Sequence, residues 1–444
     1  MNIVLDVSSG AIHLFDECSY DYIALLNKGN SHEEIVATLS ESYRDVDLNE
    51  VKLEIDELVN QGTLFSVDDY EKVVDDFSNR ETVVKALCLH IAHDCNLKCL
   101  YCFAEEGEYH GARSLMSFDV GKKAIDFLVA HSKKRRNLEI DFFGGEPLMN
   151  FDVVKEIVTY AKSIEQKFNK NFRFTITTNG VLLNEDNMDF INEHMYNVVL
   201  SCDGRKDVHD YMRPTGNKKG SYDVIMPKFK ELIQKRGQKS YYIRGTFTHH
   251  NLDFSKDVLH MADEGFDLIS VEPVVAPLDA SYAILPEDIQ LLLKEYEDLA
   301  TTMSKRRKEG SDFTFFHFMV DLSGGPCVAK RLTGCGAGFE YLAVTPQGDL
   351  YPCHQFVGME QFKMGTVESG VTNLTLQTEF KSCNVYAKEE CQACWAKFYC
   401  SGGCSANAYN YHGSIQSVYE MGCDLERKRV ECAIYLKADQ MVNE

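Results

Sequence analysis

The chain has 444 residues, 44% of them hydrophobic, and a formal net charge of −22 at pH 7. This length predicts several domains of roughly 100–200 residues each, and the hydrophobic content excludes a disordered chain. The charge argues against nucleic-acid binding, which requires clustered Lys and Arg, and no run reaches the roughly 18 apolar residues of a membrane span.

Sixteen cysteines require an explanation. Disulfide scaffolds suit small secreted domains, whereas residues 1–6 lack the basic and apolar regions of a signal peptide. We therefore expect a cytoplasmic protein in which clustered cysteines bind metal. One cluster lies at residues 95–102 and the other at residues 327–423. The cysteines at 18, 88, 383 and 432 are interpreted as ordinary small apolar residues.

Residues 1–80 are predicted to form a separate module. Apolar and polar residues alternate in Asn2–Val7 and Ala11–Phe15, which predicts a β-hairpin. Three helical stretches follow, at Ser19–Leu26, Ser31–Ser40 and Leu48–Gln61, and the second begins with a capping box. A hairpin with three helices resembles a winged helix, but the acidic character of this segment argues against DNA binding. The polar residues 68–79 are interpreted as a linker.

Residues 81–310 alternate strand patterns with helix patterns. Six strands are predicted, at Ala86–Ile91, Glu139–Phe143, Arg173–Thr178, Val198–Cys202, Tyr241–Thr248 and Leu268–Pro273. Helical stretches between successive strands imply parallel βαβ units. The sequence therefore predicts an α/β fold with a partial (β/α)6 TIM-like barrel, whose functional residues lie at the C-terminal ends of the strands.

The first strand is followed by three cysteines in a CxxxCxxC pattern, Cys95, Cys99 and Cys102. Thiolates select zinc or iron–sulfur clusters, so a zinc knuckle is the alternative to a cluster. Three ligands for four irons leave one iron free for a small molecule. This pattern, with Tyr101 before the third cysteine, resembles the radical S-adenosylmethionine (SAM) superfamily. The resemblance implies that the methionine part of SAM chelates the free iron.

Later strand ends carry residues that resemble further motifs of that superfamily. The second strand ends in a GGEP segment at residues 144–147, and the third in a turn with an amide side chain. The fourth ends in an SxDG-like segment at residues 201–204, with an arginine ten residues after its aspartate. Each feature alone is an ordinary turn or ion pair. Together, the resemblance implies a SAM site formed by Tyr101, Gly144, Gly145, Glu146, Asn179, Ser201, Asp203 and Arg213.

Two charged residues on the last two strands, Arg244 and Glu272, are expected to face the barrel interior. Buried charges usually need partners. They are therefore interpreted either as cavity residues or simply as partners of each other. No catalytic acid or base is predicted.

Residues 311–444 hold the second cysteine cluster. CxxC pairs alone are typical of zinc ribbons. The full spacing, with an aromatic hairpin at Tyr341–Val344 and Asp349–Tyr351, resembles the SPASM domain of peptide-modifying radical SAM enzymes. This implies two auxiliary 4Fe-4S clusters, one held by Cys391, Cys394, Cys400 and Cys423, the other by Cys335, Cys353 and Cys404. The fourth ligand of the latter is Cys327, a substrate thiolate or none.

Within that family, the block from Gly334 to Gln355 most resembles the thioether-forming maturases of cysteine-rich SCIFF peptides. The resemblance implies three 4Fe-4S clusters, SAM, a ribosomally made cysteine-rich precursor peptide and an electron donor such as flavodoxin or ferredoxin. It also implies that a 5′-deoxyadenosyl radical derived from SAM takes a hydrogen from a substrate residue, and that a cysteine sulfur then bonds to that carbon.

Residues 1–80 resemble the module by which such enzymes capture a leader peptide as an added strand; a purely structural cap is the alternative. Other functions remain open for the whole chain. The rival enzymatic activities are a sulfatase-maturase-like oxidation and a carbon–carbon crosslink. The non-enzymatic rival is an iron–sulfur electron carrier or peptide chaperone.

Overall fold

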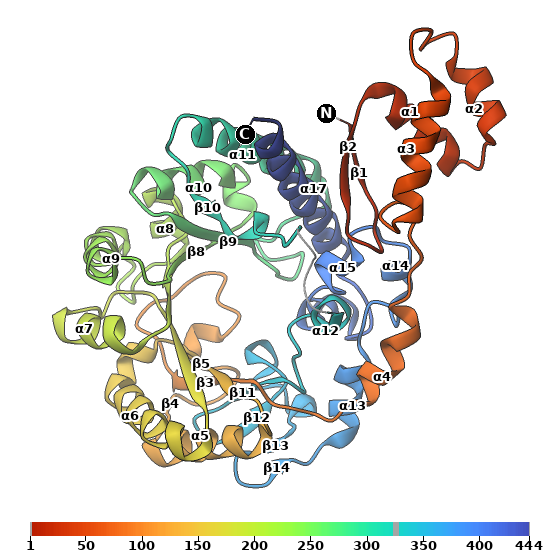
Figure 1. The fold of residues 1–444 in the computed structure, drawn as a ribbon. Coiled ribbons are helices and arrows are strands. Elements are labelled where there is room, and N and C mark those ends of the chain that lie inside the picture. The colour runs from red at the N-terminus through yellow and green to blue at the C-terminus, as the bar shows by residue number, and fades with distance from the viewer. Residues whose placement is uncertain (1, 323–327, 444) are drawn as a thin grey trace.

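A curved, mostly parallel sheet forms the centre of the molecule in this computed structural model, which describes residues 2–322 and 328–443 (Figure 1). Its six barrel strands are hydrogen-bonded in chain order and run parallel. They are β3 (Ala86–His93), β5 (Asn137–Gly144), β6 (Asn171–Thr178), β7 (Asn197–Ser201), β8 (Tyr242–Phe247) and β9 (Leu268–Pro273). The predicted partial (β/α)6 barrel is confirmed.

Helices cover the outer side of this sheet (Figure 1). They are α5 (Phe118–His131), α6 (Phe151–Phe168), α7 (Glu185–His194), α8 (Lys206–Met212), α9 (Tyr222–Arg236), α10 (Phe254–Asp263) and α11 (Ile289–Lys308). Along β5 and β6 every second residue is buried. The buried set, such as Ile140 and Phe174, joins the main hydrophobic core. Side chains alternate between the two faces of a strand, so the intervening residues face the inside of the barrel.

The C-terminal segment continues the same sheet. Strand β11 (Tyr341–Val344) pairs in parallel with β3, and β12 (Asp349–Tyr351), β13 (Gly365–Thr366) and β14 (Gly370–Val371) follow antiparallel. On the other edge β10 (Thr314–Phe315) pairs with β9, and β4 (Ser114–Leu115) pairs with the end of β3. One hydrophobic core runs from Val84 to Leu436. The division between residues 81–310 and 311–444 therefore stays a prediction.

The described part of the C-terminal segment contains six α-helices: α12 (Val328–Thr333), α13 (Leu374–Ser382), α14 (Glu389–Gln392), α15 (Lys397–Cys400), α16 (Ser405–His412) and α17 (Glu420–Asn443). The long α17 lies along α11, where Arg429 donates to the hydroxyl of Tyr296 at 2.9 Å. No helix among the described residues has the length and apolar character needed to cross a lipid bilayer.

The N-terminal module has its own small core, formed around Tyr22, Ile35 and Ile55. It consists of the hairpin β1 (Asn2–Leu5) and β2 (Ile12–Phe15) with helices α1 (Glu17–Asn27), α2 (His32–Leu39) and α3 (Leu48–Asn60). The predicted capping box of Ser31 and Glu34 starts α2. The three helices stand away from the barrel (Figure 1).

The residues interpreted as a linker are largely helical and packed on the C-terminal segment. They form η1 (Glu71–Val73) and α4 (Val74–Asn79). Asp68 accepts hydrogen bonds from Lys397 at 2.8 Å and from the hydroxyl of Tyr386 at 2.6 Å. The ring of Tyr70 meets that of Phe398 edge to face at 5.0 Å. These contacts hold the segment in place, and its polar composition did not indicate them.

Candidate active site

The CxxxCxxC loop begins two residues after β3 ends, at the C-terminal edge of the barrel. Cys95, Cys99 and Cys102 are half-buried. Burial raises the pKa of Cys95 and of Cys99 to about 12; Glu146 and then the Cys99 and Cys102 thiols add to the shift at Cys95, and the Cys102 thiol adds to it at Cys99. The three thiols therefore lie within electrostatic reach of one another. A bound cation favours the thiolate and would reverse these shifts.

The two glycines of the GGEP segment allow the end of β5 to contact the start of this loop. A Cβ on Gly145 would lie 2.0 Å from the carbonyl oxygen of Asp94, and one on Gly144 would lie 2.3 Å from that of Ala92. The Gly145 amide donates to the Ala92 carbonyl at 2.7 Å. Any larger side chain would separate the two strand ends.

Glu146 joins the second and third strand ends from inside the protein. Its carboxylate is fully buried and accepts from the Thr178 hydroxyl at 2.7 Å, the Asn179 amide at 2.8 Å and the Leu148 amide at 3.0 Å. Burial raises the pKa of Glu146 to about 7, although these donors oppose the shift. Its carboxylate thus fixes the turn that carries Asn179.

The side chain of Asn179 reaches the cysteine loop. Its amide nitrogen donates to the side-chain oxygen of Asn96 at 2.7 Å and lies 3.7 Å from the Cys95 sulfur. The first three strand ends are therefore connected through direct contacts around Cys95. This is the arrangement expected if they surround one ligand.

Three of the predicted SAM residues form a single buried cluster. The carboxylate of Asp203 is inaccessible to solvent and accepts from the hydroxyl of Tyr101 at 2.8 Å and from Arg213 at 3.0 Å. The backbone amide of Thr246, on β8, also donates to it at 2.9 Å. Asp203 thereby fixes the aromatic ring of the cysteine loop and the guanidinium after α8 relative to each other.

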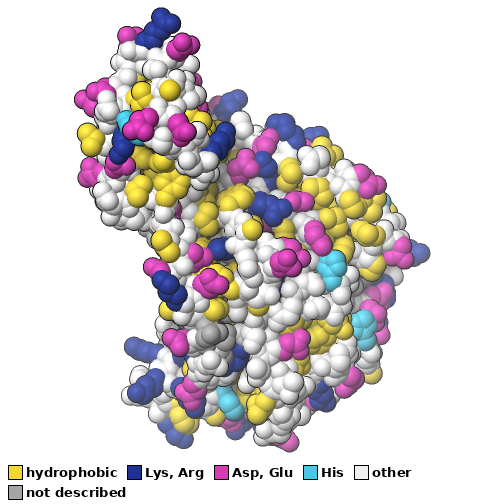
Figure 2. All heavy atoms as spheres, turned by 90° about the vertical axis from the view of Figure 1, so that its right-hand side faces the viewer, with side chains coloured by type: hydrophobic (Ala, Val, Ile, Leu, Met, Phe, Trp, Pro, Cys, Tyr) yellow, Lys and Arg dark blue, Asp and Glu magenta, His cyan; other side chains and the backbone are white. Residues whose placement is uncertain are grey.

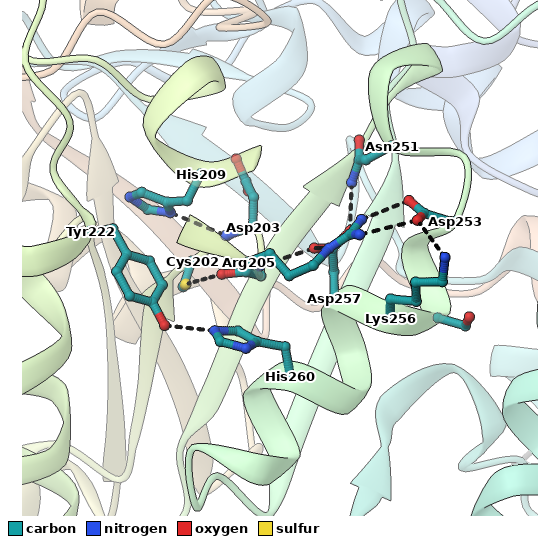
Figure 3. Close-up of polar contacts among 12 residues, drawn as sticks. Cys202, Asp203, Arg205, His209, Tyr222, Asn251, Asp253, Lys256, Asp257 and His260 are labelled. Carbon is teal, nitrogen blue, oxygen red and sulfur yellow. Dashed lines mark hydrogen bonds and ion pairs between the residues drawn. The ribbon is translucent and has the colours of Figure 1, made fainter. Parts of the chain in front are cut away.

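Polar groups behind Asp203 hold its turn in place (Figure 3). The Asp203 amide donates to buried His209 at 3.3 Å, and Arg205 binds Asp257 at 2.8 Å and Asp253 at 2.6 Å. Sequence reasoning assigned no role to these residues. His209 lies in a segment that resembles the superfamily, so it could have been noticed. The partners of Arg205 lie about 50 residues away and carried no local signal.

Ser201, the remaining predicted SAM residue, ends β7 and is half-buried. In the parallel ladder it pairs with Arg244 of β8. Arg244 lies 3.8 Å from Glu272 of β9. The two charged residues expected in the barrel interior are thus an ion pair beside this strand end.

A buried aromatic cluster that sequence reasoning missed supports the cysteine loop. The ring nitrogens of His90 and His93 are 3.0 Å apart, and the hydroxyl of Tyr109 donates to the Gly144 carbonyl at 3.1 Å. The Tyr109 ring contacts both histidines. Alternation along β3 gave no signal, because the strand is buried on both faces.

The C-terminal cysteines form two sets. A cavity of about 240 Å³ is lined by Cys391, Cys394, Cys400 and Cys423. Burial raises the pKa of the Cys400 thiol, and the other three thiols of the cavity raise it further, after Glu426. These four sulfurs, from α14, α15, α17 and the loop between the first two, therefore surround one volume.

The second set contains Cys335, Cys353 and Cys404. Burial raises the pKa of the Cys353 thiol, and the thiols of Cys404 and Cys335 add to the shift. Cys353 is buried, whereas Cys335 and Cys404 are exposed. Cys327, a candidate fourth ligand, lies outside the described residues.

The donor sets fit iron–sulfur clusters better than single ions. Among the described residues no three Cys, His, Asp or Glu side chains converge on a point that one metal ion would occupy. A cubane cluster instead has one thiolate on each iron, so its ligands surround a volume. All three sets supply only sulfur, the ligand type that such clusters require.

The comparisons with known proteins agree with this geometry. The sequence profile of the Radical SAM superfamily matches residues 89–258. A cysteine-type anaerobic sulfatase-maturating enzyme of Clostridium novyi is 28% identical over 332 residues, covering 71% of this chain and 86% of that protein. An uncharacterized protein of Methanocaldococcus jannaschii is 36% identical over 233 residues, covering 51% of this chain and 77% of that protein.

A solved structure, that of Streptococcus suis SuiB bound to the precursor peptide SuiA, has the same fold with a TM-score of 0.55 at 16% identity. The match covers 94% of this chain and 97% of that one, so it extends into residues 1–80. The predicted resemblance is confirmed for the superfamily. This chain belongs to the radical SAM superfamily and is an enzyme that uses S-adenosylmethionine and a 4Fe-4S cluster.

Proposed function

We propose that this enzyme forms thioether crosslinks, each between a cysteine sulfur and a carbon of another residue, in a ribosomally made cysteine-rich peptide. The observation that carries this proposal is the second C-terminal cysteine set. Its three thiols would bind three of the four irons of a cubane cluster. Since Cys335 and Cys404 are exposed, a substrate thiolate can reach the remaining iron. Cys327 as fourth ligand is the alternative.

We assign three 4Fe-4S clusters to the three cysteine sets. The first is held by Cys95, Cys99 and Cys102, and the others by the two C-terminal sets. The first set would hold the cluster that binds SAM, and together these groups, once reduced, would supply the radical chemistry that removes a hydrogen atom from the substrate. A protein such as flavodoxin or ferredoxin would donate the electron. The two C-terminal clusters would accept the electron released when the sulfur–carbon bond forms.

The chain's own residues would bind and orient SAM. Gly144 and Gly145 let the β5 backbone approach it, and Asn179 and Ser201 offer polar side chains at the next two strand ends. The Asp203 carboxylate holds the guanidinium of Arg213, which suits the SAM carboxylate. It also fixes the half-buried ring of Tyr101 through the hydroxyl of that residue.

The N-terminal module would bind the leader of the precursor peptide. Its two-stranded sheet pairs with no other strand among the described residues, so its edges can accept a further strand. Hydrophobic side chains gather on this lobe (Figure 2). Those exposed are Leu14, Tyr20, Val46, Leu53, Val59, Phe65 and Val67. The SuiB structure with its precursor peptide extends over the same part of the chain.

Oxidation of a protein cysteine is the second candidate, because the Clostridium novyi relative is a sulfatase-maturating enzyme. Such an oxidation needs no sulfur–carbon bond. It would leave a peptide whose remaining cysteines still react with an alkylating reagent.

Mass spectrometry of a precursor peptide treated with the reconstituted, reduced enzyme tests the proposal. We expect the loss of two hydrogens per crosslink, one from carbon and one from sulfur, and cysteines that no longer alkylate. Cys95→Ala should abolish the product and the release of 5′-deoxyadenosine. An unmodified peptide, or one with every cysteine still alkylated, would contradict the proposal.

A further inference from the structure

Two charged residues face the inside of the barrel beside the predicted SAM site. Arg244 lies between buried Ile243 and Gly245 on β8, and its side chain is 51% exposed. On β9 the side chain of Glu272 is 32% exposed, while its neighbour Val271 is fully buried in the main core. Because neighbouring residues of a strand point to opposite faces, both charged side chains lie on the inner face.

Glu272 has two arginines and a histidine nearby but no hydrogen bond. Its carboxylate lies 3.8 Å from Arg244, 3.6 Å from His317 and 3.7 Å from Arg429 of α17. None of these distances is a hydrogen bond, and no other described residue donates to it. The Arg429 nitrogen nearest Glu272 is buried and also lacks a hydrogen-bond partner. The Glu272 carboxylate is therefore held by electrostatic attraction, and its oxygens remain free to accept hydrogen bonds.

The charges of this group are fixed at neutral pH. Burial would raise the pKa of Glu272, but His317, Arg429 and Arg244 lower it to about 2. Burial lowers the pKa of His317 to about 3, so this imidazole is uncharged. Glu272 is thus a permanent anion and a weak base. This favours a role as hydrogen-bond acceptor over one in proton transfer.

The pair lies between the two regions that the proposed reaction must connect. Arg244 pairs in the sheet with Ser201, and Glu272 pairs with Thr246, whose amide donates to Asp203. On the other side, Glu272 lies 3.7 Å from Arg429 of α17, the helix that also carries Cys423 of the C-terminal cysteine segment.

We propose that Arg244 and Glu272 anchor the backbone of the substrate residue from which hydrogen is taken. In an extended peptide the N–H and C=O of one residue point to the same side. The carboxylate of Glu272 accepts this N–H, and the guanidinium of Arg244 donates to this C=O. Since the anchor contacts only backbone, it holds residues with different side chains at the same place. The inference rests on the proposed function for its peptide substrate.

The test combines enzyme variants with a backbone change in the precursor peptide. One peptide carries an ester in place of the amide at the acceptor residue, which removes only the N–H. The full-length enzyme is compared with Glu272→Gln, Arg244→Ala and the control Glu264→Gln, which alters an ion pair with Lys230 on the outer helices. Crosslinks formed per 5′-deoxyadenosine, the KM for peptide and the Kd for SAM are measured.

We expect the ester to lower crosslinks per 5′-deoxyadenosine on the order of tenfold with the unaltered enzyme. Glu272→Gln should cause a similar loss with the amide peptide and little further loss with the ester. Arg244→Ala should lower coupling with both peptides, and Glu264→Gln should resemble the unaltered enzyme.

If the ester and Glu272→Gln each lowered crosslinks per 5′-deoxyadenosine independently, so that the two losses combined in full, the anchor would be overturned. A loss of SAM affinity in Arg244→Ala that equals its loss of product would overturn it too, because the pair would then belong to the cofactor site. Normal crosslinking of the ester by every variant would refute the anchor alone. Absence of any crosslink with the unaltered enzyme and amide peptide would refute the proposed function and the anchor together.

Discussion

At the scale of single residues, the motifs of the first three strand ends could be read from the sequence, but their supporting contacts could not. Cys95, Gly145 and Asn179 stand in local patterns. The Asp203 cluster depends on the Thr246 backbone amide, 43 residues away. Such a donor has no sequence signature, because every residue except proline carries one. The ion pair of Arg205 and Asp257 was not predictable either, because the two residues lie 52 positions apart in the sequence.

Gly145→Ala tests the contact between the second strand end and the cysteine loop. The added Cβ would lie 2.0 Å from the Asp94 carbonyl, so the loop must shift. We expect a loss of stability of about 1–3 kcal/mol, weaker SAM binding and incomplete assembly of the first cluster. Thermal unfolding, SAM titration and iron content measure these effects. Gly111→Ala, whose Cβ meets nothing closer than 3.5 Å, is the control, and equal behaviour of the two variants would contradict the account.

At the scale of elements, periodicity predicted the six barrel strands because each alternates or runs apolar over five to eight residues. The pairing of β11 with β3 was not predictable, because paired positions such as Ala86 and Tyr341 lie 255 residues apart. Pairing over that distance leaves no local pattern in the sequence, because each strand's own alternation says nothing about which strand lies beside it. The polar composition of residues 68–79 predicts a linker, whereas the structure shows a largely helical segment packed on the C-terminal segment. Their structure depends on a few partners in the C-terminal segment.

Asp68→Ala tests the packing of residues 68–79 on the C-terminal segment. Lys397 is nearly buried and Asp68 is its partner, with side chains 10% and 25% exposed. Removing the carboxylate leaves the ammonium without its counter-charge, so we expect a loss of about 1–3 kcal/mol in unfolding free energy. Faster proteolysis near residues 68–79 should accompany it. Asp69→Ala, which removes only an exposed ion pair with Lys72, should have no measurable effect, and a matching loss there would contradict the docking.

Helix α17 offers a matched pair of cysteines for testing the closed C-terminal set. Cys423 lines the cavity of four thiols, whereas Cys432 is buried in the main core. Cys423→Ala should lower the iron content of the reconstituted enzyme by about one third, since one of three clusters loses a ligand. Cys432→Ala should retain full iron content. Equal iron content in both variants would contradict the assignment of this set.

At the scale of the whole molecule, three cysteine sets and a separate N-terminal module are arranged around one barrel. The sequence indicated the sets through their spacing, and the structure groups the C-terminal thiols as that spacing implied. Sequence reasoning could infer only that Arg244 and Glu272 pair with each other. Their proposed role as an anchor depends also on Arg429, which approaches Glu272 from the C-terminal helix α17. For the proposed reaction, the substrate must therefore lie inside the barrel, between SAM and the second C-terminal set.

Transfer of deuterium from the peptide to 5′-deoxyadenosine tests this central claim most directly. The precursor is labelled with deuterium at one candidate acceptor residue at a time and treated with the full-length, reconstituted enzyme. We predict deuterium in 5′-deoxyadenosine only when the labelled residue is the one that becomes crosslinked to cysteine sulfur. Crosslinked peptide formed with no deuterium in 5′-deoxyadenosine from any labelled residue would contradict the account.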